Sequence, residues 1–186
     1  MKKIKKTLLI ILILGTVNLV FGAKLLIPMD RNQTDHLKAY GVVYWILKQG
    51  QNVEWLLNYR GGSFLTDAQS GIIEEMRLRG VSFERPGNSA VMQIYSTIDK
   101  NNMDIALLEK ASKIAIYTPP NKQPWDDAVT MALTYAEIDY DKIWDKEVLD
   151  GKLSEYDWLH LHHEDFTGQY GKLYANYRNH KWYREQ

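Results

Sequence analysis

Three histidines and two acids gather in one short stretch of the chain, Trp158-Leu-His-Leu-His-His-Glu-Asp165. The residues before the acids favour a β-strand, and side chains along a strand alternate between its two faces. His160 and His162 should therefore point to the same face, with Glu164 and Asp165 on the loop that leaves the strand. Ligands of open α/β sheets bind at this carboxyl end of the strands. We expect His160, His162 and Glu164 to line a pocket as catalytic candidates, with Asp165 as a ligand-binding residue.

Two interpretations of this cluster remain open. Two histidines at this spacing can hold one metal ion, with Asp165 or Glu164 completing the site. The sequence does not fix a third ligand, although His36 and Asp30 are candidates. The favoured alternative is a partly buried, hydrogen-bonded pair or a histidine that transfers protons. We therefore assign no metal ion to the site, and the sequence leaves the cofactor unknown.

A second candidate site is Arg60-Gly61-Gly62-Ser63, which follows another expected strand. Glycine has no Cβ, so the backbone here can approach a ligand closely, and Arg60 can hold a carboxylate with paired N–H groups. Asp30, at the end of the first expected strand, should open onto the same cleft. Asp30, Arg60, Gly61 and Gly62 are thus ligand-binding candidates. The alternative, that the glycine pair is only a turn, is the commoner case.

A third candidate is the loop from Thr118 to Asp127, which leads from a strand into a helix. The free amide groups at a helix N-terminus can bind an anion. The acids Asp126 and Asp127 make a negatively charged ligand less favourable there. A proline-stiffened loop with an ordinary acidic first turn is the preferred interpretation.

Short apolar runs alternate with helix-like segments along the rest of the chain. We expect strands at 24–30, 53–59, 81–83, 113–118, 140–144 and 158–162, and helices after 35, after 66, over 91–103 and after 124. Thr66 and Gln69 form a plausible capping box for the second helix. This alternation predicts an α/β fold, with a mostly parallel sheet and helices on both faces. We expect one α/β domain over residues 23–186. The stretches that start at Lys24 and Lys113 look alike, so 23–110 and 111–186 are possible sub-units that arose by duplication, but any two βα units look alike, and that interpretation is preferred.

The first 22 residues have the order of a secretory signal peptide. A lysine-rich start (1–6) precedes a Leu/Ile core (8–14) and a milder segment that ends in small residues (15–22). The apolar core is shorter than the roughly 20 residues of a transmembrane helix. We expect cleavage after Gly22 and export to the periplasm, the cell surface or the medium, without membrane contact afterwards. An uncleaved anchor is the alternative.

Charge and absent motifs exclude several classes of function. Removal of residues 1–22 takes away four lysines, so the mature chain has 19 basic and 23 acidic residues and a net charge of −4. This net negative charge does not favour the binding of nucleic acid. The chain has no cysteine, hence no disulfide and no cysteine nucleophile, and it lacks the Walker A, dinucleotide-binding and Gly-x-Ser-x-Gly motifs. The expected partner is a small-molecule substrate or ligand.

Three longer runs carry a resemblance to a known family. They are Leu25-Leu-Ile-Pro-Met-Asp30 with Leu37-Lys-Ala-Tyr-Gly41, Val53-Glu-Trp-Leu-Leu-Asn-Tyr-Arg-Gly-Gly-Ser-Phe64, and Tyr156-Asp-Trp-Leu-His-Leu-His-His-Glu-Asp-Phe-Thr-Gly168. They resemble exported bacterial proteins labelled asparagine synthetase B-like. The resemblance implies a variant of the class I glutamine amidotransferase-like fold, which is flavodoxin-like. In that fold a strand beginning Tyr-Asp precedes a functional loop, and Tyr156 to Glu164 matches that place.

The resemblance also implies a longer protein with a cysteine nucleophile on a strand-to-helix turn. The chain is therefore expected to be an inactive N-terminal part, incomplete at its carboxyl end, of an amidotransferase-like hydrolase or transferase. True asparagine synthetase B enzymes have an N-terminal cysteine and an ATP-pyrophosphatase loop, which this chain lacks, so asparagine synthesis is not carried over. The alternative is a non-enzymatic module that binds glycans or peptides, because one fold hosts many functions and exposed aromatic rings stack on sugars.

Overall fold

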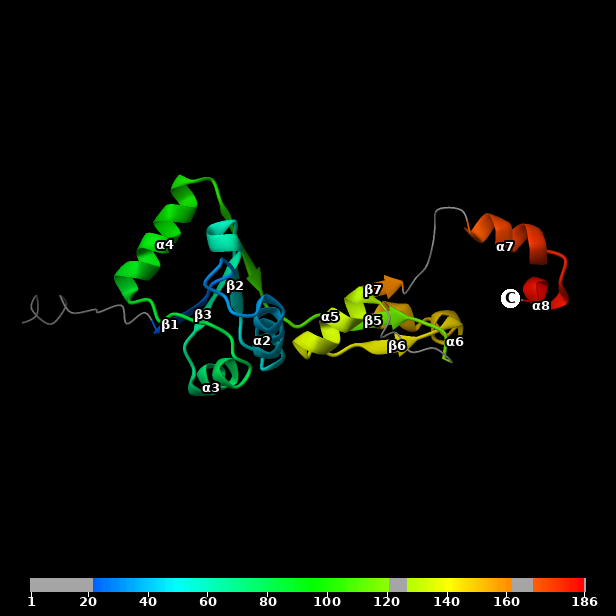
Figure 1. Ribbon diagram of the computed structural model, residues 1–186, viewed down its shortest axis with the longest axis horizontal. Helices are drawn as coiled ribbons and strands as arrows, with labels where there is room; N and C mark the ends of the chain where they lie inside the picture. Colours follow the sequence, from blue (N-terminus) through cyan, green and yellow to red (C-terminus); the bar gives the residue numbers. More distant parts are fainter. Residues whose placement is uncertain (1–21, 121–126, 162–168, 186) are drawn as a thin grey trace, which may run out of the picture.

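The chain builds two separate sheets (Figure 1) in the computed structural model, which describes residues 22–120, 127–161 and 169–185. The first is antiparallel in the order β1-β3-β2-β4, with β1 (Lys24–Ile27), β2 (Val53–Leu57), β3 (Ser63–Asp67) and β4 (Asp104–Leu108). The second is parallel in the order β6-β5-β7, with β5 (Ile114–Tyr117), β6 (Asp141–Ile143) and β7 (Trp158–Leu161). The predicted signal peptide, apart from Gly22, lies outside the described residues.

Seven short or medium α-helices connect and flank these strands in the described residues. They are α2 (His36–Lys48), α3 (Ser70–Leu78), α4 (Asn88–Lys100), α5 (Ala128–Ala136), α6 (Asp145–Leu149), α7 (Gln169–Tyr177) and α8 (Lys181–Glu185). Two 3₁₀ turns accompany them, η1 (Tyr59–Gly61) and η3 (Lys152–Glu155). In place of the strand expected at 81–83 there is an isolated β-bridge between Leu26 and Glu84. None of the described helices has the length and apolar character needed to cross a membrane.

The expectation of one mostly parallel, flavodoxin-like sheet of the class I glutamine amidotransferase type is wrong. The reason lies between β2 and β3, where Asn58, Arg60, Gly61 and Gly62 all have positive φ angles. These left-handed residues reverse the chain, so β3 returns beside β2 as a hairpin, with Trp55 opposite Phe64. The sheet is therefore antiparallel from its second strand onward. The helix expected to begin at Thr66 starts later, because Thr66 lies in β3.

The parallel arrangement expected for the second half is present in β5, β6 and β7. Ile116 lies opposite His160 in the register of β5 and β7. Asp157 ties the beginnings of these strands together, because its Oδ2 accepts a hydrogen bond of 2.9 Å from the Lys113 backbone N–H. Its Oδ1 lies 2.6 Å from the Lys110 ammonium. Asp157 thus has a structural role at the amino ends of two neighbouring strands.

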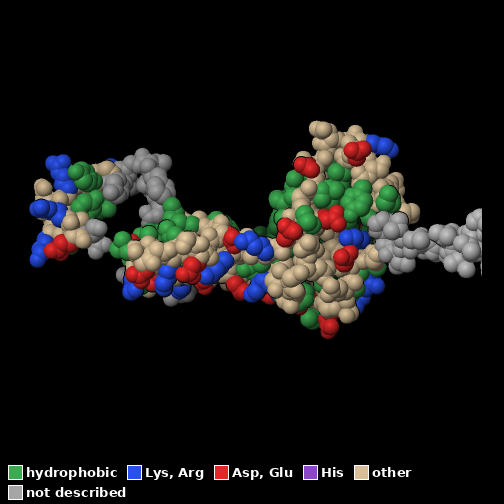
Figure 2. Space-filling view, turned by 180° about the vertical axis from the view of Figure 1, so that it is seen from behind, with side chains coloured by type: hydrophobic (Ala, Val, Ile, Leu, Met, Phe, Trp, Pro, Cys, Tyr) green, Lys and Arg blue, Asp and Glu red, His purple; other side chains and the backbone are tan. Residues whose placement is uncertain are grey.

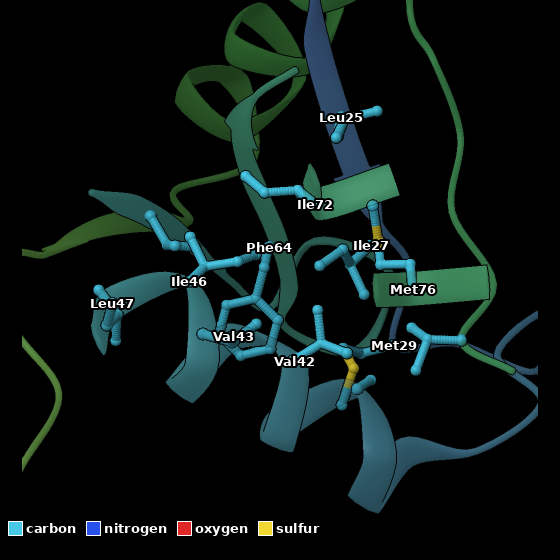
Figure 3. Close-up of a cluster of buried hydrophobic side chains, with 13 residues drawn as sticks. Leu25, Ile27, Met29, Val42, Val43, Ile46, Leu47, Phe64, Ile72 and Met76 are labelled. Atoms are coloured by element: carbon cyan, nitrogen blue, oxygen red, sulfur yellow. The ribbon is translucent and has the colours of Figure 1, made fainter. Parts of the chain in front are cut away.

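The antiparallel sheet has an apolar core on each face. Helices α2 and α3 cover one face, where Leu25, Ile27 and Phe64 meet Val42 and Met76 (Figure 3). Helix α4 covers the opposite face, and the side chains packed there are Leu26, Leu56, Leu65, Val91, Ile94 and Ile98. Strand alternation explains this division, because neighbouring residues of β1 point to opposite faces and both faces are apolar.

Helix α2 also packs against α5, which joins the two sheets. The Lys38 ammonium lies 2.6 Å from Glu137 at the end of α5. The Tyr135 hydroxyl donates a hydrogen bond to Asp35, the residue that caps α2. Because α5 follows β5 and covers one face of the parallel sheet, this contact positions the second sheet relative to the first.

Candidate functional site

The carboxyl end of the parallel sheet holds a pair formed by His160 and Asp127. His160 lies on β7, and its Nε2 is 3.0 Å from Asp127 Oδ1. Asp127 is the N-cap of α5, and the same oxygen accepts hydrogen bonds from the backbone N–H groups of Val129 (2.8 Å) and Thr130 (3.0 Å). Both side chains of the pair are largely buried, with 18% of His160 and 11% of Asp127 exposed. The pair is therefore held rigidly by a strand and a helix N-terminus.

The hydrogen bonds keep Asp127 ionised. Burial raises the pKa of its carboxyl, but the N–H of Thr130 and the ring of His160 lower it by more, so the pKa lies below the ordinary 3.8. An ionised carboxylate only accepts hydrogen bonds, so a neutral His160 ring in this position donates its Nε2–H to Asp127. Nδ1 of His160 then carries a lone pair. A histidine in this state can accept a proton from water or from a hydroxyl group.

Thr118 supplies a further polar atom on the same face of the parallel sheet. It follows β5 directly, and strand alternation places it on the face of Ile114 and Ile116, which pack against Leu133 of α5. Only 2% of the residue is exposed. Its Oγ1 is buried and has no hydrogen-bond partner within the part of the chain that the structure describes. Buried hydroxyl groups usually have a partner, so this one is available to a ligand or a water molecule.

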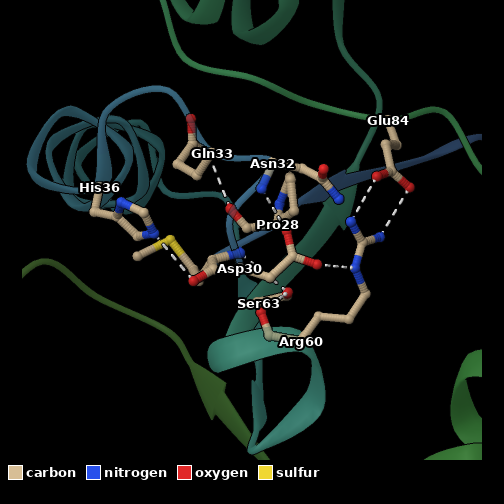
Figure 4. Close-up of polar contacts among 9 residues, drawn as sticks. Pro28, Asp30, Asn32, Gln33, His36, Arg60, Ser63 and Glu84 are labelled. Carbon is tan, nitrogen blue, oxygen red and sulfur yellow. Dashed lines mark hydrogen bonds and ion pairs between the residues drawn. The ribbon is translucent and has the colours of Figure 1, made fainter.

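The second candidate site is occupied by the chain's own side chains (Figure 4). Arg60 Nε donates to Asp30 Oδ2 at 2.7 Å, and its two terminal nitrogens donate to Glu84 at 3.0 and 2.9 Å. The hydrogen bond from Arg60 is the main reason that the pKa of Asp30 lies below its ordinary value. Two internal carboxylates thus hold the guanidinium that was expected to hold a carboxylate of the ligand.

Gly61 and Gly62 form part of the turn between β2 and β3. Gly61 approaches the backbone so closely that a Cβ built there would lie 2.4 Å from the carbonyl oxygen of Met29. The carbonyl oxygen of Gly62 accepts a 3.0 Å hydrogen bond from the Trp55 indole. The expected close approach does occur at Gly61 and Gly62, but its partner is the chain itself.

In the described residues no group of three or more His, Cys, Asp or Glu side chains is arranged to hold a metal ion. His36 Nε2 lies 3.1 Å from the carbonyl oxygen of Met29 (Figure 4), so this ring stabilises the start of α2. His162, Glu164 and Asp165 lie outside the described residues.

The sequence placed Thr118 and Asp127 at the two ends of a separate candidate loop and did not predict that they lie beside His160. The signal for Asp127 was present, because an acid before a helix that follows a parallel strand must lie at the carboxyl edge of the sheet. Thr118 carried no such signal, since a threonine at the end of a strand is ordinary. His160 and Asp127 are brought together by the parallel pairing of β5 with β7.

Comparisons of the chain with protein-family models, with curated proteins and with solved structures find no match. The function must therefore be argued from the geometry of the chain itself.

Proposed function

We propose that the chain contributes a proton-transfer site to an exported hydrolase or transferase that acts on an amide or a related small polar substrate. His160 is the general base, and Asp127 orients its ring and stabilises the positive charge that forms when the ring is protonated. The observation that carries the proposal is the 3.0 Å contact between His160 Nε2 and Asp127 Oδ1 at the carboxyl end of a parallel strand.

The chemistry follows from this contact. With Nε2–H donated to Asp127, Nδ1 takes a proton from a water molecule or a hydroxyl group as that oxygen attacks the carbonyl carbon of the substrate. The same ring then returns the proton to the leaving nitrogen. Such acid–base catalysis contributes about 10²–10⁴-fold to a rate. The resemblance to asparagine synthetase B-like proteins supports an amide as the substrate.

Ring ¹⁵N spectra of His160 test the geometry separately from the chemistry. In the neutral ring we expect the proton on Nε2 and a non-protonated Nδ1. The variant Asp127→Asn should shift the ring towards a mixture of tautomers, because the amide can also donate. A ring protonated on Nδ1 in the unmodified chain would contradict the proposed orientation.

Hydrolysis assays test the function. The probes are 4-nitrophenyl acetate and the release of ammonia from L-glutamine and L-asparagine. We expect His160→Gln to lower the rate of any hydrolysis by about 100-fold, whereas His180→Gln, between α7 and α8, should leave it unchanged. Equal rates for both variants would refute the role of His160, and no hydrolysis above the buffer rate would refute catalysis by this chain alone. Binding of glutamine without turnover, lost in His160→Gln, would favour the binding module instead.

A further inference from the structure

We infer that helix α7 docks into an apolar groove between α2, α5 and β7 of its own chain. The groove is a cavity of about 330 Å³. Leu37 and Tyr40 of α2, Ala128 and Ala132 of α5, and Trp158 of β7 form its walls, and every side chain that lines it is apolar or aromatic.

At the groove, β7 is less covered than strands of parallel sheets usually are. Among the described residues, β7 pairs only with β5, and Trp158 is 42% exposed. Leu37 and Tyr40 are exposed to a similar degree. A neighbouring cavity of about 290 Å³, lined in part by Tyr44 and Trp55, shares Tyr40 and Trp158 with the groove. Strands of parallel sheets are normally covered on both faces, so a contiguous apolar surface here indicates a binding partner.

Helix α7 has the complementary surface. Leu173, Tyr174 and Tyr177 recur at helical spacing on one stripe of α7. Leu173, Tyr174 and Tyr177 are all exposed, although two of these rings also contact α8. The ring centroids of Tyr177 and Trp182 are 5.5 Å apart, and those of Tyr174 and Tyr183 are 6.2 Å apart. Figures 1 and 2 show α7 and α8 beyond the parallel sheet and away from α2. Within the described residues, the groove and the stripe of α7 are therefore two apolar surfaces that remain partly exposed to water.

Charge favours the same pairing. Residues 169–186 hold four basic side chains and one acidic side chain, a net charge of +3. Residues 23–168 hold 22 acidic and 15 basic side chains, a net charge of −7. The basic side chains of α7 and α8 are visible at the far end of the molecule in Figure 2. Opposite net charges attract the helical segment to the rest of the chain and steer its approach.

Chain length permits the contact. Residues 162–168 separate β7 from α7, and eight extended peptide steps reach about 27 Å. Helix α5, which forms one wall of the groove, has nine residues, as α7 does, and a helix of that length extends about 14 Å. Docking of α7 is independent of any chemistry at His160.

Engineered cysteines test the inference, because the chain has none of its own. In the full chain, Ala132→Cys with Leu173→Cys should form a disulfide within most monomers under mild oxidation. The matched control, Leu78→Cys with Leu173→Cys, places the first cysteine on exposed α3 and should not form one. A disulfide between two chains would show that a second copy occupies the groove, and no disulfide would show that α7 does not reach it; either result overturns the inference.

Oxidative footprinting of Trp158 provides a second measurement that needs no cross-link. Leu173→Asp places a charge on the apolar stripe of α7 and should raise the labelling rate of Trp158 severalfold. Leu78→Asp, at a position exposed on α3, should not change it. Circular dichroism confirms that both variants are folded. Equal labelling of Trp158 in the two variants would contradict docking of α7.

Discussion

Gly41 of α2 lies directly against the carbonyl oxygen of Ala136 at the end of α5, so closely that a Cβ built at position 41 would be 1.8 Å from that oxygen. Among the glycines of the described chain, Gly41 has the shortest distance from a built Cβ to a neighbouring atom. Helix α2 covers the antiparallel sheet and α5 covers the parallel sheet. Because Gly41 has no side chain, the two helices can pack this closely.

Gly41→Ala should therefore destabilise the protein. Helix propensity alone favours alanine by about 1 kcal/mol, but the clash with backbone forces α2 and α5 apart, and overpacking costs about 1–3 kcal/mol or more. We expect a net loss of about 2 kcal/mol in the free energy of unfolding, measured by urea denaturation. Gly71→Ala in α3 is the control, because nothing lies within 4 Å of its Cβ. An unchanged midpoint for Gly41→Ala would refute the close packing.

The turn between β2 and β3 makes a second prediction. Gly61 has φ +82° and its Cβ would lie 2.4 Å from Met29 O, whereas Gly80 has φ +69° with open space around it. Gly80→Ala should cost about 1–2 kcal/mol, the penalty of a left-handed residue. Gly61→Ala should cost more by about 1–3 kcal/mol, because the clash is added. Equal losses in urea denaturation would contradict the steric contact.

The bonds of Arg60 can be measured by a double-mutant cycle. Arg60→Met and Glu84→Gln remove the two sides of a bidentate contact in which 24% of the arginine side chain is exposed. We expect a coupling energy of about 1 kcal/mol. The exposed pair of Lys146 and Asp150, at the end of α6, is the control and should show a clearly weaker coupling. A coupling near zero at Arg60 would leave this side chain available to a ligand.

Asp127 predicts how stability changes with pH. Its pKa is lower in the folded chain than the ordinary 3.8, as is that of Asp35, mainly through the Lys38 N–H. The unfolded state therefore takes up protons first as the pH falls, and stability that is complete above 3.8 is lost as the pH falls through the folded pKa.

Asp127→Asn keeps a side chain that can cap α5 but removes the charge. We expect its free energy of unfolding to fall less than that of the unmodified chain between about pH 4 and pH 2. Asp99→Asn, on the exposed side of α4, is the control and should follow the unmodified chain. Parallel curves for Asp127→Asn and the unmodified chain would contradict the role of this carboxylate.

Local patterns were sufficient for some elements and misleading for others. The strands at Lys24, Val53 and Trp158 and the parallel arrangement of the second sheet follow from apolar runs that alternate with helices. Strand β3 was mistaken for the start of a helix, because Thr66 serves equally as a helix cap and as a β-branched strand residue. The choice between these roles depends on pairing with β2, which no local pattern contains.

By itself the sequence determined that His160 would stand at the carboxyl end of a parallel strand, because the period of a strand and the position of a βα loop are local properties. Only the tertiary structure decided its partner, since Asp127 is 33 residues away and reaches it through the pairing of β5 with β7. The same holds for Arg60, whose charge was evident but whose carboxylate partners are Asp30, after β1, and Glu84, at the isolated bridge. Contacts between distant segments depend on how strands pair and helices pack. For this reason local order predicted one large parallel sheet, whereas the chain forms an antiparallel sheet and a separate parallel sheet.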